Sequence, residues 1–398
     1  MAKLSHLKDV HVLLDEVLRK ARRLTQSDAG SIYLLEDNVL NFSYIHNDTL
    51  FGDSGVNRYL YANQPLAVDN RSLAGYVALT GKPLVIDDAY CLPDGMPFTF
   101  NDTFDHRSGY RTHSVLAMPL VTSQNQTVGV LQIINPQKDD QQPSTFTPGD
   151  LLRLSRFAAT AAAAIERAIL TRESILRMIK VCELRDPKET GVHANRVGAY
   201  AAEVYHQWSL KQGVAPADIQ RNKDLLRVAA MLHDLGKVAI SDLILKKPAR
   251  LDSEEFRTMQ YHTIYGARLF QNQASDLDAL SAEIALNHHE KWDGTGYPGK
   301  IDDISLDQPP LGNGKQGEEI PLAGRIVALA DVYDALVTHR VYKGSWSEPT
   351  TLDYIKDQSG KHFDPEVVDA FLAIYDVIAA IRDEYQEEAE SVSRETSP

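Results

Sequence analysis

The chain has 398 residues, of which 43% are hydrophobic and 24% charged, and its formal net charge is -14. This length allows two or three domains, and the acidic balance argues against a surface for a nucleic-acid polymer, which needs clustered Lys and Arg. The only cysteines, Cys91 and Cys182, lie far apart. That spacing argues against a disulfide framework or a thiolate zinc site and favours a reducing cytoplasm.

Neither a membrane span nor a signal peptide is expected. The longest apolar run, Phe157–Ile165, is too short to cross a bilayer. Residues 1–20 fit an amphipathic helix and lack the apolar core and the small-residue cleavage site of a signal peptide. The sequence therefore predicts a cytoplasmic protein without a membrane partner.

Residues 1–149 mix helical and strand patterns. Val10–Leu24 carries apolar residues at helical spacing, and the β-rich runs Ser31–Leu35 and Val39–Ile45 predict a hairpin. A short helix and three strands follow, at Ser72–Thr80, Leu84–Ile86, Ser114–Leu120 and Thr127–Asn135. The pattern predicts an α+β sensor domain, an antiparallel sheet with flanking helices.

This segment resembles the GAF domain family. The resemblance is carried by the phrases DAGSIYLLEDNVLNFSYIHND, SLAGYVALTGKPLVIDD and HSVLAMPLVTSQNQTVGVLQIIN. It implies a domain that binds a small molecule or mediates dimerisation, although no residue identifies the ligand. Four side chains are candidates for contact with a cofactor, with surface or loop positions as the favoured alternative: His46, Cys91, His106 and His113.

A long helix is predicted from about Pro148 to Leu184. Its residues 150–184 are expected to link the two domains. Its apolar residues alternate steps of three and four and form a heptad seam, made of Leu154, Ala158, Ala161, Ile165, Ala168, Ile175, Ile179 and Cys182. The seam could pack on the sheet of its own chain or pair with a second copy. The second interpretation is preferred and predicts a homodimer through this helix.

Residues 185–385 are mainly helical in pattern. Thr190 is a candidate cap of a helix that ends at about Trp208. Further helices are predicted at Lys223–Leu235, Ser253–Phe270, Asp276–Glu290, Pro321–Thr338 and Pro365–Tyr385. Residues 293–319 are rich in Gly, Pro and Asp and predict a loop, and residues 386–398 predict a frayed polar tail.

Potential metal ligands recur through this helical segment. His233 and Asp234 follow an apolar run, and although neighbouring ligands on a helix point about 100° apart, a carboxylate can bridge two ions. Asp331 lies in the apolar stretch RIVALADVYDAL, where an unpaired carboxylate is costly. The candidate ligands are Glu189, His193, His233, Asp234, His262, His288, His289 and Asp331.

Simpler explanations exist for single residues. Asp331 could pair with Arg325, and His288 with His289 could be a surface pair. Taken together, five imidazoles and three carboxylates without a thiolate suit iron, manganese or zinc, and they exceed the needs of one ion. Two or three divalent ions are therefore expected. Such sites catalyse displacement at phosphorus, and their positive charge would hold an anionic phosphodiester.

Residues 175–385 resemble the HD-GYP family of bacterial cyclic di-GMP phosphodiesterases. The resemblance is carried by His233-Asp234 with Lys237 and by HHEKWDGTGYPG, IPLAGRIVALADVYDAL, HRVYK and SGKHFDPEVVDAF. It implies an all-α HD-superfamily domain that hydrolyses cyclic di-GMP to pGpG, and in some members onward to GMP. The alternatives are cyclic GMP-AMP or another nucleotide as substrate, or a receptor for cyclic dinucleotides without catalysis.

The resemblance also implies individual roles. The metal role falls on the same eight residues, with Asp234 bridging two ions and holding the attacking hydroxide, and with Lys237 at a phosphate oxygen or the attacking group. Glu189 resembles the extra ligand of a subgroup with a third metal, commonly iron. Substrate contacts fall on Tyr297, Arg340 and Lys343.

Two features depart from the family pattern. Val341 stands where the family often has proline. The stretch Gly299–Glu319 is longer than the usual connection between the GYP and IPLA motifs. It could be a lid beside the substrate cleft or an idle surface insertion, and the second alternative is favoured.

Overall fold

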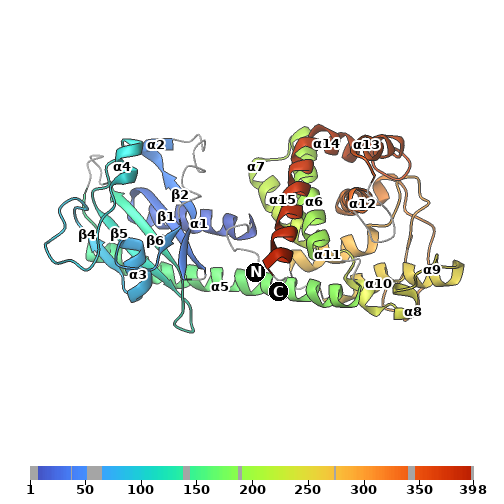
Figure 1. Cartoon of the computed structure of the whole chain (residues 1–398), viewed down its shortest axis with the longest axis horizontal. Helices are drawn as coiled ribbons and strands as arrows, with labels where there is room; N and C mark the ends of the chain where they lie inside the picture. Colours follow the sequence, from blue (N-terminus) through green and yellow to red (C-terminus); the bar gives the residue numbers. More distant parts are fainter. Residues whose placement is uncertain are drawn as a thin grey trace. The chain divides into compact units, whose positions relative to one another are not determined.

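The computed structural model describes residues 8–36, 38–51, 65–137, 144–186, 191–272, 275–338 and 346–395 (Figure 1). The chain divides into two compact units, Met1–Arg172 and Glu173–Pro398. The division falls inside the long helix α5 (Pro148–Arg185), so one helix contributes residues to both units. Among the described helices, none is both long and apolar enough for a bilayer crossing.

The first unit is built on a six-stranded antiparallel sheet of order β3-β2-β1-β6-β5-β4. The strands are β1 (Ser27–Glu36), β2 (Val39–Asn47), β3 (Leu66–Ala67), β4 (Leu84–Ile86), β5 (Val115–Val121) and β6 (Thr127–Pro136). The turns after β1 and β5 contain Asn38 and Asn125 at positive φ, 63° and 61°, a conformation that asparagine tolerates. The α+β prediction is therefore confirmed.

Two cores cover the two faces of this sheet. Along β5, Leu116 and Met118 face helices α1 (Lys8–Thr25) and α5, whereas Val115 and Ala117 face α3 (Leu73–Thr80). This alternation follows from the period of two in a strand. Two short helices complete the unit, α2 (Asp48–Phe51) and α4 (Thr103–Ser108).

The heptad seam of α5 lies inside the cores of its own chain. Leu154 and Ile165 are fully buried against the first unit's sheet. Ile175 and Ile179 are 5% and 6% exposed and belong to a core of the second unit. The preferred interpretation of the seam as a contact between subunits is therefore wrong for these positions, because their apolar surface is already covered.

The second unit is all-helical among its described residues. Its longer helices are α6 (Gly191–Lys211), α7 (Pro216–Ala230), α9 (Ser253–Gln260), α10 (His262–Leu269), α11 (Asp276–Asn287), α12 (Leu322–Val337), α13 (Glu348–Asp357), α14 (Pro365–Ala373) and α15 (Tyr375–Glu395). Short turns of helix are η3 (Leu235–Ala239), α8 (Asp242–Leu245) and η4 (Gly317–Glu319). The main core joins α6, α7, α11, α12 and α14 around the fully buried Tyr200, Tyr333 and Phe371.

Several helix boundaries differ from the predictions. The helix expected at Lys223–Leu235 begins at Pro216 and ends at Ala230, so His233 and Asp234 stand in a turn. The helix expected at Ser253–Phe270 is divided at Tyr261. That expected at Pro365–Tyr385 is divided at Ile374 and continues to Glu395, so most of the predicted tail is helical. Helix α13 was not predicted.

Candidate metal centre

Two clusters of potential ligand atoms lie in the second unit. The first contains His193 of α6, His233 of the turn after α7, and Asp331 of α12. The second contains Asp234, His262, His288 and His289. Within each cluster the ligand atoms lie within 4.8 Å of one another. Seven of the eight predicted metal ligands are thus brought together from segments far apart in the sequence.

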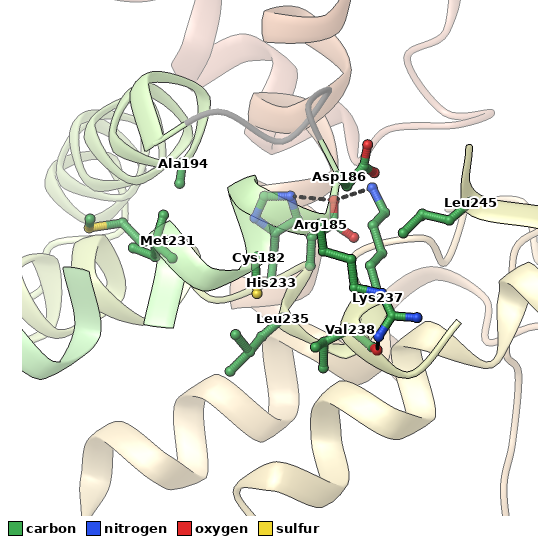
Figure 2. A pocket seen from close by; sticks show the side chains of 12 residues that line it. Cys182, Arg185, Asp186, Ala194, Met231, His233, Leu235, Lys237, Val238 and Leu245 are labelled. Atoms are coloured by element: carbon green, nitrogen blue, oxygen red, sulfur yellow. Dashed lines mark hydrogen bonds and ion pairs between the residues drawn. The ribbon is translucent and has the colours of Figure 1, made fainter. Parts of the chain in front are cut away.

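Asp234 stands between the two clusters. Its Oδ1 lies 3.2 Å from His262 Nε2 and 3.6 Å from His288 Nε2. Its Oδ2 lies 3.2 Å from His233 Nε2 and 2.7 Å from Lys237 Nζ. Figure 2 shows His233 and Lys237 pointing toward one another across this position. One carboxylate therefore faces both sets of imidazoles, the geometry that a bridging ligand needs.

The imidazoles are oriented by hydrogen bonds from their outer nitrogens. His233 Nδ1 lies 2.8 Å from the carbonyl oxygen of Ala230, and His262 Nδ1 lies 2.7 Å from that of Met259. His288 Nδ1 lies 3.0 Å from the carbonyl oxygen of Ala285. Because a carbonyl oxygen only accepts, each Nδ1 carries a proton. In the neutral ring the lone pair is then on Nε2, the atom that faces the clusters.

This arrangement leaves electron pairs facing one another. His262 Nε2 and His288 Nε2 are 3.4 Å apart, and Asp234 Oδ1 is buried without a well-aligned hydrogen bond among the described residues. Burial lowers the pKa of His288 and, together with the neighbouring His288 and His262, lowers that of His289 well below the usual range. Neutral imidazoles beside a carboxylate form a donor set that fits a divalent cation.

Asp234 remains ionised in this site. Burial alone would raise its pKa, but the positive charge of Lys237, whose Nζ lies 2.7 Å away, opposes burial, and the pKa lies well below the usual range. A carboxylate kept in its charged form is the state that binds a metal ion.

A residue that the sequence analysis missed supports the first cluster. Asp334 is 1% exposed, and its Oδ2 lies 2.8 Å from His193 Nδ1. The guanidinium of the buried Arg196 donates to both oxygens of Asp334, at 2.6 and 2.8 Å. His193 Nε2 is thereby directed to Asp331 Oδ1, 3.5 Å away. The sequence does contain a hint of this role, because Asp334 follows Asp331 by three residues in the same apolar helical stretch, where a second carboxylate can support a metal ligand.

Tyr297 lies directly beside the second cluster. Its ring stacks on His289 with centroids 4.8 Å apart and an interplanar angle of 30°, and its main-chain nitrogen donates to the His289 carbonyl at 3.2 Å. Burial raises the pKa of the Tyr297 hydroxyl, which therefore stays protonated. The predicted substrate residue is thus next to the candidate metal ligands.

The buried carboxylate of Glu290 holds the loop around Tyr297 through two hydrogen bonds. This carboxylate is 2% exposed and accepts hydrogen bonds from the main-chain nitrogens of Gly299 at 2.6 Å and Lys315 at 3.1 Å. The two residues stand near opposite ends of the stretch predicted as a lid or an idle insertion. Both ends of that stretch are therefore hydrogen-bonded to the same side chain, Glu290, which follows the candidate ligands His288 and His289.

The middle of the same stretch is attached to α10. The guanidinium of Arg268 donates to the carbonyl oxygens of Ile304 and Leu306, and the Tyr261 hydroxyl donates to that of Pro309 at 3.0 Å. Because α10 begins at His262, the insertion connects the helix that carries one candidate ligand with the loop that carries Tyr297.

The end of the linker helix contacts the segment after Asp234. Arg185 donates to the carbonyl oxygens of Val238 and Ile240, the latter at 2.6 Å. A small pocket of about 30 Å³ lies between this helix end and the His233 turn (Figure 2). This volume has room for water but not for a nucleotide.

The other predicted residues are either outside the described residues or have different partners from those expected. Glu189, Arg340 and Lys343, together with Val341, lie outside the described residues. Arg325, the suggested partner of Asp331, instead pairs with Asp364 at 2.6 Å. His288 is 1% exposed, which excludes the surface-pair explanation for that residue.

The first unit contains a separate cavity of about 330 Å³. It is lined by apolar side chains such as Leu73 and Phe104 and by polar ones such as Ser31 and Gln132. The four cofactor candidates of the sequence analysis are not among its lining residues. His46 faces Asp15, His106 faces Asp102, His113 lies near Asp88, and Cys91 is exposed.

Comparisons with known proteins match both units. A GAF domain family model matches residues 9–165, and an HD domain family model matches residues 196–367. A 3'3'-cGAMP-specific phosphodiesterase 2 of Vibrio cholerae is 37% identical over 212 residues, 53% of this chain and 36% of that protein.

Two further relatives are named cyclic di-GMP phosphodiesterases. One, from Vibrio cholerae, is 40% identical over 227 residues, 54% of this chain and 42% of that protein. The other, from Thermotoga maritima, is 39% identical over 228 residues, 56% of this chain and 55% of that protein. The chain thus spans about half the length of these relatives or less.

Proposed function

This chain carries a GAF domain followed by an HD domain, and we propose that the HD domain is a metal-dependent phosphodiesterase that hydrolyses cyclic di-GMP. The observation that carries the proposal is the inward direction of the imidazole Nε2 atoms around Asp234. The activities for which the relatives are named support the substrate class.

Two divalent ions, iron or manganese, would occupy the two clusters. His193, His233 and Asp331 would hold one, and His262, His288 and His289 the other, with Asp234 shared. A third ion would require Glu189, which is outside the described residues. When bound, such ions supply Lewis acidity and a water of lowered pKa for attack at phosphorus.

The protein's own groups would bind and orient the substrate. Lys237 Nζ, which lies 2.7 Å from Asp234 Oδ2, would donate to a phosphate oxygen or to the attacking group. The protonated Tyr297 hydroxyl would donate to a base or a sugar. Arg340 and Lys343 would bind phosphate. The product would be pGpG, with GMP if the linear dinucleotide is cut again.

Cyclic GMP-AMP is the second candidate substrate, because one relative is named for it. Hydrolysis of both cyclic dinucleotides by protein purified without oxygen tests the proposal, beside Asp234→Ala and the control Asp369→Ala, whose parent residue is exposed on α14. We expect turnover by the parent and the control, and a loss of about 10³-fold or more for Asp234→Ala. Equal turnover by all three proteins would refute the metal mechanism.

We also propose that the GAF cavity binds an uncharged, partly apolar small molecule that regulates hydrolysis. Among the described lining residues the only charged side chain is Asp105. Its oxygens accept from the Tyr90 hydroxyl at 2.9 Å and from Thr112 N and Oγ1 at 2.6 and 2.9 Å. Uncharged compounds should raise the melting temperature of the parent but not of Ala74→Trp, which fills the cavity. Equal stabilisation of both proteins would contradict this.

A homodimer through α5 would need a face outside the two cores. Leu170, Val181 and Leu184 are 54%, 57% and 75% exposed and lie within about 60° of one another around the helix. Val181→Asp with Leu184→Asp should lower the molar mass in solution, whereas Leu243→Asp on α8 should not.

A cytoplasmic location, proposed on the two cysteines, agrees with their not being joined in a disulfide within the described residues.

A further inference from the structure

Helix α9 presents an aromatic side chain that no core explains. The structure describes all eight residues of α9, and none of them is buried. Phe256 of this helix is 47% exposed and is not a member of any of the hydrophobic cores of the described residues. An apolar ring with this exposure contributes little to folding through burial.

The ring of Phe256 contacts the candidate substrate residue Tyr297. The rings of Phe256 and Tyr297 have centroids 5.9 Å apart and planes at 83°. Tyr297 in turn stacks on His289 and lies 6.3 Å from His262. The rings therefore form a continuous row from the candidate metal centre outward, and its exposed end is Phe256.

The position of Phe256 relative to the candidate ligands is well fixed. At the end of α9, the carbonyl oxygen of Met259 accepts the hydrogen bond of His262 Nδ1. At its start, Asp252 and Glu255 form a capping box, and Lys247 Nζ lies 2.6 Å from Glu255 Oε1. Phe256 is thus carried on a short helix whose last turn also orients a candidate ligand.

We propose that Phe256 contacts the substrate by stacking on one nucleobase of the cyclic dinucleotide, while Tyr297 forms the perpendicular wall of the same subsite. The inference rests on the proposed function and adds a residue that determines affinity for bases. Aromatic side chains stack on bases of any identity. Phe256 therefore favours cyclic dinucleotides as a class and contributes little to the choice between guanine and adenine.

The test compares Phe256→Ala, Phe256→Leu, Phe256→Tyr and the control Leu269→Ala, whose parent residue is 55% exposed on α10. KM, kcat, metal content and melting temperature are measured for cyclic di-GMP and cyclic GMP-AMP. We expect KM to rise about 10-fold or more for Phe256→Ala with both substrates, less for Phe256→Leu, and little for Phe256→Tyr. Metal content, kcat and the control should stay near the parent.

A KM within twofold of the parent for Phe256→Ala would overturn the inference while leaving the proposed function intact. A loss of metal or melting temperature in Phe256→Ala with full recovery of KM in Phe256→Leu would assign a structural role and overturn it as well. If the metal-loaded parent neither binds nor hydrolyses either dinucleotide, the proposed function fails, and the inference fails with it.

Discussion

His193 and the other oriented imidazoles of the candidate metal centre reach the same arrangement by different means. His233, His262 and His288 each follow the end of a helix, where the last carbonyl groups lack partners within the helix, and their Nδ1 atoms use those carbonyls. His193 lies in the first turn of α6 and not after the end of a helix. Its Nδ1 instead uses the carboxylate of Asp334.

The orientation of three imidazoles therefore depends on main-chain carbonyl groups, whereas that of His193 depends on one side chain. Three imidazoles keep their direction as long as their helices end where they do. The direction of His193 depends on Asp334, which depends in turn on Arg196. Substitutions can therefore disturb the two clusters separately.

The largest effect is expected for Asp334→Asn. The change leaves the buried Arg196 without its charged partner and removes the carboxylate acceptor of His193 Nδ1. Loss of one partner from a buried ion pair lowers the free energy of unfolding by about 3–5 kcal/mol, and loss of such a support weakens metal binding by about 10- to 100-fold. Urea unfolding and metal titration measure both. Values equal to those of the exposed control Asp369→Asn would show that His193 needs no carboxylate.

The Asp334 carboxylate should also make the free energy of unfolding depend on pH in acid. Burial would raise the pKa of Asp334, but hydrogen bonds from His193 and Arg196 lower it from 3.8 to about 2 in the folded protein. The folded pKa is depressed, so its stabilisation is present above pH 4 and is lost as the pH falls toward 2. The loss should be roughly 2–3 kcal/mol. Unfolding measured from pH 5 to pH 2.5 should show more than half of this loss in the parent, and an identical profile for Asp334→Asn would contradict the assignment.

Gly236→Ala tests the backbone side of the comparison. A Cβ at Gly236 would overlap the His262 carbonyl oxygen and the main chain of Gly266, so α10 must shift. We expect about 1–3 kcal/mol of destabilisation and weaker metal binding in the second cluster. Gly149→Ala is the matched control, because its Cβ would meet only side-chain atoms at 3.5 Å or more. Unchanged metal binding in Gly236→Ala would mean that His262 tolerates movement of its helix.

The smallest effect is expected for Arg268→Ala, which releases residues 304–306 from α10. These bonds lie at least partly in solvent, so the stability loss should be about 1 kcal/mol. Retained turnover with unchanged KM would support the idle-insertion alternative. A change in KM without a change in metal content would instead support a role of the insertion at the substrate cleft.

The sequence predicted the sheet, and the seven side chains that gather in the two clusters, better than the local geometry around those side chains. Strand alternation and helical spacing identified the elements of the first unit, because those periods reflect burial directly. The turn position of His233 could not be read from the helical run before it, because the apolar pattern continues past Ala230, where α7 ends. The roles of Asp334 and Phe256 depend on contacts between distant segments. The buried α5 seam was misassigned because a core and a partner helix impose the same heptad pattern.

The central claim is that Asp234 is shared by two neighbouring cation sites. Metal analysis of protein purified without oxygen tests it most directly, with the parent, Asp234→Ala and the control Asp369→Ala measured side by side. The account predicts at least two ions per chain in the parent and the control, and at least one fewer in Asp234→Ala. Equal metal content in all three proteins would contradict it.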